Sequence, residues 1–225
     1  MNRTKIEWAG YTWNPIKGLC PEDCKTPDGK SYCYARAMYQ RFGWDKKKTL
    51  DRAFIERYGI IPPDSKVFIC STFELFHPAV PKTWRDWIFE QVEKRKDLTF
   101  IVLTKHPELI DRPMPANVWL GASVTGRQDQ WRVDKLFGSM AKTRFISFEP
   151  LLESAPSLST LSCELLDWII VGRMTGHGRK NDPKREWIQE IVTIARLYGL
   201  PVFLKNNLRE VWGSDLIQEY PRVAP

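Results

Sequence analysis

Three of the five cysteines lie close together in the sequence. Cys20, Cys24 and Cys33 fall within GLCPEDCKTPDGKSYCYAR, residues 18–36, with the spacing C-x3-C-x8-C, whereas Cys70 and Cys163 stand apart. In a reducing compartment, clustered thiols indicate metal or redox chemistry more than disulfides. The question is therefore what three thiols without a fourth partner can bind.

Several uses of the three thiols compete. A structural zinc site needs four ligands, so His77 or His106 has to complete the set from a distant part of the sequence. A disulfide or an isolated reactive thiol is a second alternative. A cluster that only transfers electrons or supports the fold is a third.

A four-iron cluster held by three thiolates offers different chemistry, because one iron is left without a protein ligand. Iron–sulfur clusters normally take four cysteines, and an open position on a metal is where a substrate or cofactor binds. S-adenosylmethionine can chelate that iron through its amino and carboxylate groups. One electron from the cluster then cleaves its C–S bond and releases a 5′-deoxyadenosyl radical. We expect a [4Fe-4S] cluster on Cys20, Cys24 and Cys33, with S-adenosylmethionine as the second cofactor.

The elements that must position these thiols can be predicted from six short apolar runs. Each run is rich in β-branched and aromatic residues, which favours a strand buried on both faces of a parallel sheet. The runs are KVFICS (66–71), TFIVLTK (99–105), NVWLGASV (117–124), TRFISFEPL (143–151), DWIIVG (167–172) and LPVFLKN (200–206).

Segments with helical periodicity lie between the apolar runs. Residues 84–97 and 185–199 each place apolar side chains along one face, and 127–141 does so more weakly. RAMYQRFGW (36–44) and DRAFIERYG (51–59) predict further helical turns. Repeated strand–helix alternation predicts an α/β fold, a partial or complete (β/α) TIM-type barrel of parallel strands, with an open doubly wound sheet as the alternative. We expect a single domain over residues 1–225.

Polar residues follow the apolar runs directly, where the reactive groups of parallel α/β folds collect. If the strands are as predicted, these side chains converge on one rim. One such residue alone can be a helix N-cap, as for Ser71 or Thr104. The full set comprises Ser71, Thr72, Glu74, Thr104, Lys105, His106, Ser123, Thr125, Arg127, Glu149, Arg173, Lys205, Asn206 and Asn207.

The composition restricts the partners. The net charge of +7 is compatible with a polyanion such as nucleic acid, and equally with a slightly basic soluble protein. Three of the ten tryptophans, Trp8, Trp13 and Trp44, flank the cysteine loop, where they can stack on a base or belong to the core. No apolar run is long enough to span a bilayer, and MNRTKIEWAG has no apolar signal core, so we expect a cytoplasmic protein without membrane contact.

The cysteine loop resembles that of the radical SAM enzymes, which carry C-x3-C-x2-C in a loop after the first strand of a partial barrel. Cys20 and Cys24 match the first spacing, and Tyr32 stands in the aromatic position before Cys33. The second spacing has eight residues instead of two, and the extra six lie close to KTPDGK, a turn-rich segment. A loop insertion there can still return Cys33 to the cluster.

More specifically, the chain resembles a poorly characterised family of phage, bacterial and archaeal proteins with a three-Cys motif, described as radical-SAM-like. One departure is RMTG after residue 172, where family members commonly have a glycine and an acid; Arg173 and Met174 stand there instead. The shared segments are YTWNPIKG (11–18), CYAR (33–36), FELFHPAVP (73–81), VLTKHPELI (102–110), NVWLGASV (117–124), RFISFEPLL (144–152), WIIVG (168–172) and PVFLKN (201–206).

The resemblance implies roles for the strand-end residues. Ser71, Thr72 and Glu74 stand where the superfamily binds the methionine ammonium of S-adenosylmethionine. Ser123 and Arg127 stand where its ribose or carboxylate is held. Glu149 and Lys205 face substrate or cofactor as catalytic residues; alternatively, Glu149 is a buried, paired carboxylate and Lys205 its ion-pair partner.

The predicted function is that of a noncanonical radical SAM enzyme, which cleaves S-adenosylmethionine reductively and abstracts hydrogen from an unidentified substrate. An electron donor such as a ferredoxin or flavodoxin is the implied partner, and a nucleic acid is the candidate substrate. The alternative from another class is a zinc-stabilised nucleic-acid-binding module without catalysis.

Overall fold

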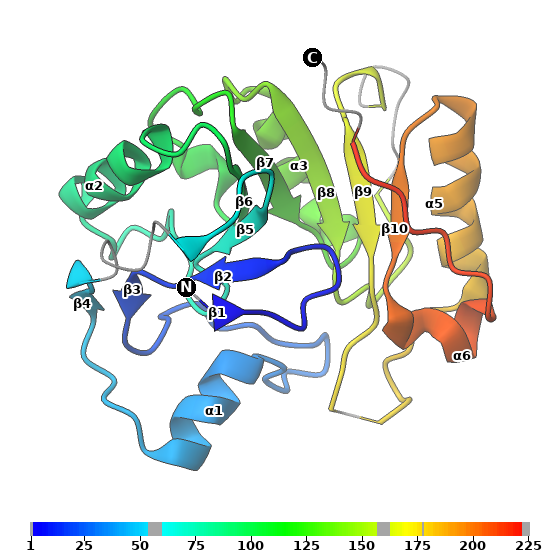
Figure 1. Cartoon of the computed structure of the whole chain (residues 1–225). Coiled ribbons are helices and arrows are strands. Elements are labelled where there is room, and N and C mark those ends of the chain that lie inside the picture. The colour runs from blue at the N-terminus through cyan, green and yellow to red at the C-terminus, as the bar shows by residue number, and fades with distance from the viewer. Residues whose placement is uncertain (1, 54–59, 157–162, 177, 222–225) are drawn as a thin grey trace. The chain divides into compact units, whose positions relative to one another are not determined.

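A computed structural model describes residues 2–53, 60–156, 163–176 and 178–221 of the chain. The chain divides into two compact units, residues 1–119 and 120–225. Each unit contributes parallel strands with helices between them (Figure 1). The single domain expected over residues 1–225 stays a prediction.

The first unit is built on strands in the order β1-β2-β5-β6. Strand β1 pairs antiparallel with β2, while β2, β5 and β6 run parallel. A separate antiparallel pair is formed by β3 and β4. The bounds are β1 Asn2–Arg3, β2 Tyr11–Trp13, β3 Ile16–Lys17, α1 Tyr34–Phe42, β4 Thr49–Leu50, β5 Lys66–Ile69, α2 Lys82–Glu93, β6 Thr99–Thr104 and η2 Pro107–Leu109.

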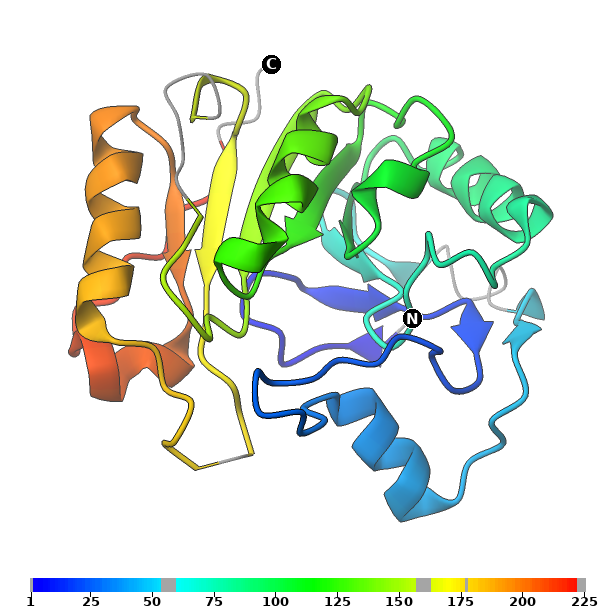
Figure 2. The same ribbon diagram turned by 180° about the vertical axis from the view of Figure 1, so that it is seen from behind.

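Burial explains why these segments form strands and helices. Phe100 on β6 and Trp13 on β2 are fully buried, and their rings lie 6.3 Å apart. Helix α2 buries Ile88, Phe89 and Val92, which follow the helical period and keep its charged residues in solvent. Helix α1 differs, because Ala35 is its one buried residue. Figures 1 and 2 show α1 standing apart from the strands of this unit.

The second unit has strands in the order β7-β8-β9-β10, and β8, β9 and β10 run parallel. Its fully buried core includes Phe145, Trp168 and Val202. The bounds are β7 Val118–Ser123, η3 Arg127–Asp129, α3 Gln130–Phe137, β8 Thr143–Phe148, β9 Trp168–Val171, α5 Arg185–Leu197, β10 Val202–Leu204, η4 Asn206–Leu208 and α6 Arg209–Trp212; the first two residues of β7 belong to the first unit.

The structure confirms the α/β class and the parallel strand pairing. All six predicted strands form, each shorter than its apolar run, and helices form at the predicted positions around α1, α2, α3 and α5. Closure of the strands into a barrel stays a prediction. Most of the helical turn expected at 51–59 lies outside the described residues. None of the helices in the described ranges combines the length and the apolar character needed to cross a bilayer.

Candidate functional site

The cysteine loop is attached to the basic segment 46–48. Gly18 has φ +102°, and a Cβ at this position would lie 2.5 Å from the backbone oxygen of Lys47. Only glycine fits such a close approach in this conformation. The backbone N–H of Leu19 also donates to the Lys46 carbonyl at 3.1 Å. The first cysteine therefore follows a tightly fixed stretch of backbone.

The residues between Cys24 and Cys33 fold back on themselves. Lys25 and Ser31 form an antiparallel bridge, and Thr26 accepts at its backbone oxygen from the Gly29 N–H at 2.9 Å. The Tyr32 N–H then donates to the Cys24 carbonyl at 3.0 Å. The extra residues thus form a closed hairpin, which returns the chain to the position of Cys24.

The Cys33 sulfur occupies the N-terminus of α1. It caps the helix by accepting from the Arg36 N–H at 3.5 Å. A hydrogen bond from the Cys24 thiol is the main cause that lowers the pKa of Cys33 to about 6, with help from the helix N–H groups and the Lys105 charge. The same hydrogen bond raises the pKa of Cys24. Cys33 is therefore a thiolate at neutral pH, the form of a thiol that binds metal.

The Cys20 sulfur lies at the loop after β5. It accepts from the backbone N–H of Glu74 at 3.3 Å, and burial raises the pKa of its thiol. The Arg36 guanidinium donates to the carbonyls of Cys20 and Glu22 at 3.3 and 3.1 Å. Two elements far apart in the sequence, α1 and the β5 loop, thus fix the position of Cys20.

The three clustered thiols differ from the other two. Cys20, Cys24 and Cys33 are half-buried, whereas Cys70 and Cys163 are buried, and all five are free of disulfides. The three sulfurs do not all come within 4.8 Å of one another. Among the described residues, only Glu22, His77 and His106 bring three candidate ligand atoms that close.

His106 lies between two carboxylates. Its Nε2 is 2.8 Å from Glu22 and its Nδ1 is 3.1 Å from Glu108. Burial opposes the charged ring, but the hydrogen bonds to Glu22 and Glu108 outweigh it and raise the pKa of His106. An imidazole with a carboxylate at each nitrogen suits a protonated ring better than a metal ligand. Glu22 lies between Cys20 and Cys24, so this ion pair fixes the cysteine loop to the end of β6.

His77 packs edge-on against His106, with ring centres 5.5 Å apart. Its Nδ1 accepts from the Ala79 N–H at 3.0 Å. The neutral ring therefore carries its proton on Nε2, which leaves no lone pair there for a metal. Both histidines that could supply the fourth ligand of the zinc alternative are thus engaged in other contacts.

Two of the three predicted cofactor residues after β5, Ser71 and Glu74, are held by protein contacts. Ser71 Oγ donates to Asn14 at 3.1 Å. Glu74 is buried, and its carboxylate accepts from Thr104 Oγ1 at 2.6 Å, from the Lys105 N–H at 2.8 Å and from the Phe76 N–H at 3.2 Å. Thr72 is half-buried. Binding of S-adenosylmethionine by these three residues stays a prediction.

The loop after β7 in the second unit has its own hydrogen-bond network. Ser123 is buried, and its carbonyl accepts from Arg132 at 3.0 Å. Asp129, which the sequence pattern did not single out, accepts from the Thr125 N–H at 2.7 Å and pairs with Arg132 at 3.0 Å. Arg127 is exposed. The predicted roles of Ser123 and Arg127 stay predictions.

Glu149 and Lys205 form an ion pair across the ends of β8 and β10. Gly172 lies at the end of β9, where a Cβ would come within 2.9 Å of the Lys205 side chain and 3.2 Å of the Glu149 carboxyl carbon. The structure thus contains the ion pair that the sequence offered as the alternative to catalysis. Gly172 is the neighbour that sequence reasoning missed, and its missing side chain leaves room for the pair.

Arg173 belongs to a separate network after β9. It donates through Nε to the Asn207 carbonyl at 2.6 Å and through Nη1 to Asp182 at 3.0 Å. Asn207 in turn donates to the Arg173 carbonyl at 2.9 Å. Each unit therefore gathers its own predicted polar residues at strand ends; the single rim expected for both sets stays a prediction.

Two of the three tryptophans near the cysteine loop are core residues. Trp8 and Trp13 are 3% and 0% exposed, whereas Trp44 is 45% exposed. Trp44 alone of the three can therefore stack on a ligand.

Comparison with known proteins identifies one family. The family model described as "Protein of unknown function (DUF5131)" matches residues 3–218. No curated protein and no solved structure matches the chain.

Proposed function

The chain belongs to the DUF5131 family, and we propose that this member is a radical SAM enzyme whose cluster is held by Cys20, Cys24 and Cys33. The observation that carries the proposal is the hairpin at residues 25–31, closed by the Tyr32 N–H on the Cys24 carbonyl at 3.0 Å. The hairpin returns the chain from Cys24 to Tyr32, next to Cys33, although eight residues separate the two cysteines. The superfamily motif has only two residues at this spacing.

The donor set fits an iron–sulfur cluster. Three half-buried free thiols lie on one loop, and one of them is a thiolate at neutral pH. Burial raises the pKa of Cys20, and the hydrogen bond with Cys33 raises that of Cys24, so these two thiols give up their protons on binding the cluster. When bound, the cluster supplies one electron for cleavage of the C–S bond of S-adenosylmethionine, and a ferredoxin or flavodoxin restores that electron.

The remaining residues of the first unit shape this site. Glu22 and His106 hold the cysteine loop against the end of β6, and Arg36 holds it against α1. The half-buried Thr72 and Ser71 follow β5 beside the Cys20 loop, and their side chains are the candidates for the methionine part of S-adenosylmethionine. Glu74 has a positioning role, because its carboxylate joins the loop after β5 to the end of β6.

Glu149 and Lys205, which belong to the second unit, are the proposed catalytic residues. Both side chains are partly exposed, at 25% and 17%, so the pair stays accessible. Pairing fixes both groups in position, which suits the orientation of a polar substrate group.

The zinc-stabilised binding module is the second candidate. It is favoured by the approach of Glu22, His77 and His106 within 4.8 Å, since histidine and carboxylate are zinc ligands. The contacts of both histidines with other groups weigh against it.

Metal analysis after anaerobic purification separates the candidates. The proposal expects iron and sulfide in the wild type, their loss in Cys20→Ser, Cys24→Ser and Cys33→Ser, and their retention in the matched control Cys163→Ala. Stoichiometric zinc in the wild type, lost in His106→Gln, supports the binding module and contradicts the proposal.

A further inference from the structure

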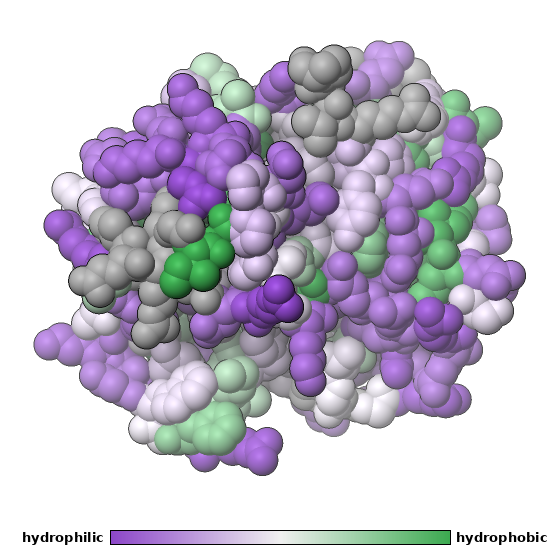
Figure 3. Space-filling model, viewed as in Figure 1, coloured by the Kyte–Doolittle hydropathy of each residue, from purple (hydrophilic) through white to green (hydrophobic). Residues whose placement is uncertain are grey.

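Helix α1 carries exposed aromatic rings next to exposed basic residues. Phe42 at the end of α1 is 54% exposed, and Trp44, just beyond the helix, is 45% exposed; the helix itself buries only Ala35. Figure 3 shows pale and green atoms gathered at the lower left, where α1 lies in Figure 1. Large exposed aromatic groups mark binding sites more often than isolated apolar residues do.

The rings form an ordered stack. Phe42 and Trp44 are stacked with centres 5.3 Å apart and planes 20° from parallel, and Tyr39 meets Trp44 edge-on at 5.3 Å. Gly43 between them adopts φ +61°, a turn that allows the two flanking rings to lie face to face. The Arg41 guanidinium also lies over the Phe42 ring, 5.3 Å from its centre, so a ligand would contact the exposed parts of the Phe42 and Trp44 rings.

The stack is fixed to the cysteine loop. The Tyr39 hydroxyl accepts from the Gly18 N–H at 2.9 Å, and the Lys46 carbonyl accepts from the Leu19 N–H at 3.1 Å. Both contacts are made immediately before Cys20. A ligand on the rings is therefore held beside the loop that carries the thiols.

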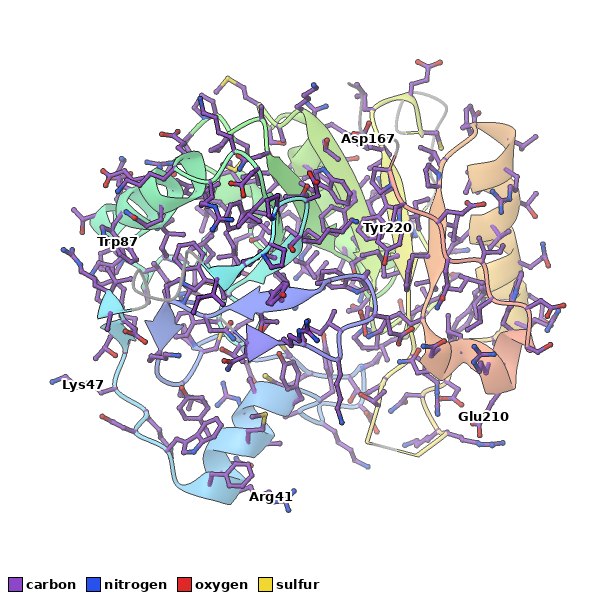
Figure 4. The ribbon with its side chains drawn as sticks, viewed as in Figure 1. Arg41, Lys47, Trp87, Asp167, Glu210 and Tyr220 are labelled. Atoms are coloured by element: carbon purple, nitrogen blue, oxygen red, sulfur yellow. The ribbon has the colours of Figure 1, made fainter. Side chains whose placement is uncertain are left out.

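The charges around the rings are positive. Residues 34–48 contain five basic side chains and one acid, Asp45. Arg41, Lys46 and Lys47 are exposed, and within the described residues no acidic side chain pairs with any of the three. Figure 4 shows Arg41 on α1 and Lys47 on the segment leading to β4. Basic side chains without an acidic partner, beside exposed aromatic rings, complement a phosphate backbone and its bases.

We infer that the stack formed by Tyr39, Phe42 and Trp44, together with Arg41, Lys46 and Lys47, is a binding surface for single-stranded nucleic acid. Bases stack on the rings and the three cations contact phosphates. A membrane surface is the less fitting occupant, because the rings lie face to face among Gln40, Arg41 and Asp45 rather than on a broad apolar helix face.

The inference adds a substrate class, single-stranded nucleic acid, to the proposed function. Only the claim that the bound strand is the substrate rests on that function. The binding itself needs no cluster. It is therefore measured on protein freed of iron as well as on the reconstituted protein, so that failure of binding and failure of cluster formation are seen separately.

The test is fluorescence anisotropy with labelled 20-nucleotide strands, dT20 and rU20, and an abasic strand of equal charge. We expect the wild type to bind dT20 or rU20 at least about tenfold more tightly than the abasic strand, since stacking accounts for roughly that factor per base. Phe42→Ala with Trp44→Ala removes this difference. The matched control Trp131→Ala, an exposed tryptophan with the Arg132 guanidinium over its ring, changes binding less than about twofold.

The cations are tested by salt dependence. Lys46→Gln with Lys47→Gln reduces the slope of log affinity against log salt by about 1.4, or roughly 0.7 for each phosphate contact on a single strand. Trp44→Phe keeps a ring and retains binding, which separates loss of stacking from loss of folding. Equal binding of wild type and the double alanine variant overturns the inference. A second result would also overturn the inference. In it, the wild type binds phosphatidylserine vesicles, the variants lose this vesicle binding, and their oligonucleotide binding is unchanged.

Discussion

The backbone N–H of Tyr32 donates to the carbonyl of Cys24 at 3.0 Å, and this bond closes the hairpin that separates Cys24 from Cys33. The Cys24 thiol lowers the pKa of Cys33 although eight residues lie between them. The eight residues between Cys24 and Cys33 therefore form a closed turn and do not carry the chain away from Cys24.

Removal of the hairpin is expected to leave the metal site intact. Deletion of residues 25–30 leaves Ser31 and Tyr32 between Cys24 and Cys33, which restores a C-x2-C spacing. Because the hairpin returns the chain to the same place, iron and sulfide per chain should stay within about a quarter of the wild-type values after anaerobic reconstitution. A fall to the level of Cys24→Ser, with the fold intact by circular dichroism, would show that the hairpin itself builds the site.

Cys33 is expected to be the most reactive of the clustered thiols in the metal-free protein. With the pKa of Cys33 lowered to about 6, its thiolate predominates at pH 7. Cys24→Ala removes the hydrogen bond that stabilises this thiolate, so the pKa of Cys33 should rise and its alkylation at pH 7 should slow several-fold.

The measurement is alkylation by iodoacetamide across pH 5 to 9, followed by mass spectrometry of the labelled peptides. Cys163 is buried and serves as the unreactive internal control. A midpoint for Cys33 near the ordinary thiol value of about 8.5, unchanged by Cys24→Ala, would contradict the hydrogen bond between the two sulfurs.

The ion pair between His106 and Glu22 makes stability depend on pH. The pKa of His106 is raised in the folded protein. The ion pair therefore makes its full contribution to the free energy of unfolding below the pKa of His106 in the unfolded chain, about 6.5. This contribution is lost as pH rises through the folded value. The free energy of unfolding of the metal-free wild type, relative to His106→Gln, should therefore fall between pH 6 and 8.

Urea unfolding at several pH values measures this difference. Glu22→Gln should weaken the same pH dependence, because it removes the carboxylate that faces Nε2. A difference between wild type and His106→Gln that rises with pH would show that the folded ring is neutral.

Gly172 is expected to be required by the Glu149–Lys205 pair. In Gly172→Ala the new Cβ meets the Lys205 side chain at 2.9 Å and the Glu149 carboxyl carbon at 3.2 Å. Because the crowded atoms belong to flexible, partly exposed side chains, we expect a cost of about 1 kcal/mol of unfolding free energy, the low end for overpacking. Lys205→Ala removes the nearest of the crowding atoms, so Gly172→Ala should cost clearly less in that background.

The control is Gly138→Ala, whose Cβ meets only the Lys135 carbonyl at 3.4 Å; we expect a change of less than about 0.5 kcal/mol. Chemical denaturation of the four proteins in the cycle gives the coupling free energy between positions 172 and 205. Strict additivity would show that the pair and the glycine are independent.

Local composition was sufficient to predict much of the fold. The Val, Ile and Phe content of β5 to β10 favours buried strands, and α5 shows a clear helical period with Ile188, Ile191 and Ala195 buried. Strand β2 escaped prediction because its three residues are too few to show a period. The barrel cannot be derived this way, since closure depends on contacts between distant segments rather than on local pattern.

The site was predictable only in part, for the same physical reason. The turn of the hairpin can be predicted from the turn-forming residues Pro27, Asp28 and Gly29. The tie between Glu22 and His106 spans 84 positions, and no local signal links such residues. The need for glycine at position 172 likewise arises from the side chains of Glu149 and Lys205. They approach Gly172 only after the strands are paired.

The most direct test of the central claim is iron and sulfide analysis after anaerobic purification, with electron paramagnetic resonance of the reduced protein before and after addition of S-adenosylmethionine. We predict about four irons per chain and a spectrum that S-adenosylmethionine perturbs. Both should be lost in Cys33→Ser but not in Cys163→Ala. A colourless protein that holds one zinc after anaerobic reconstitution would contradict this prediction.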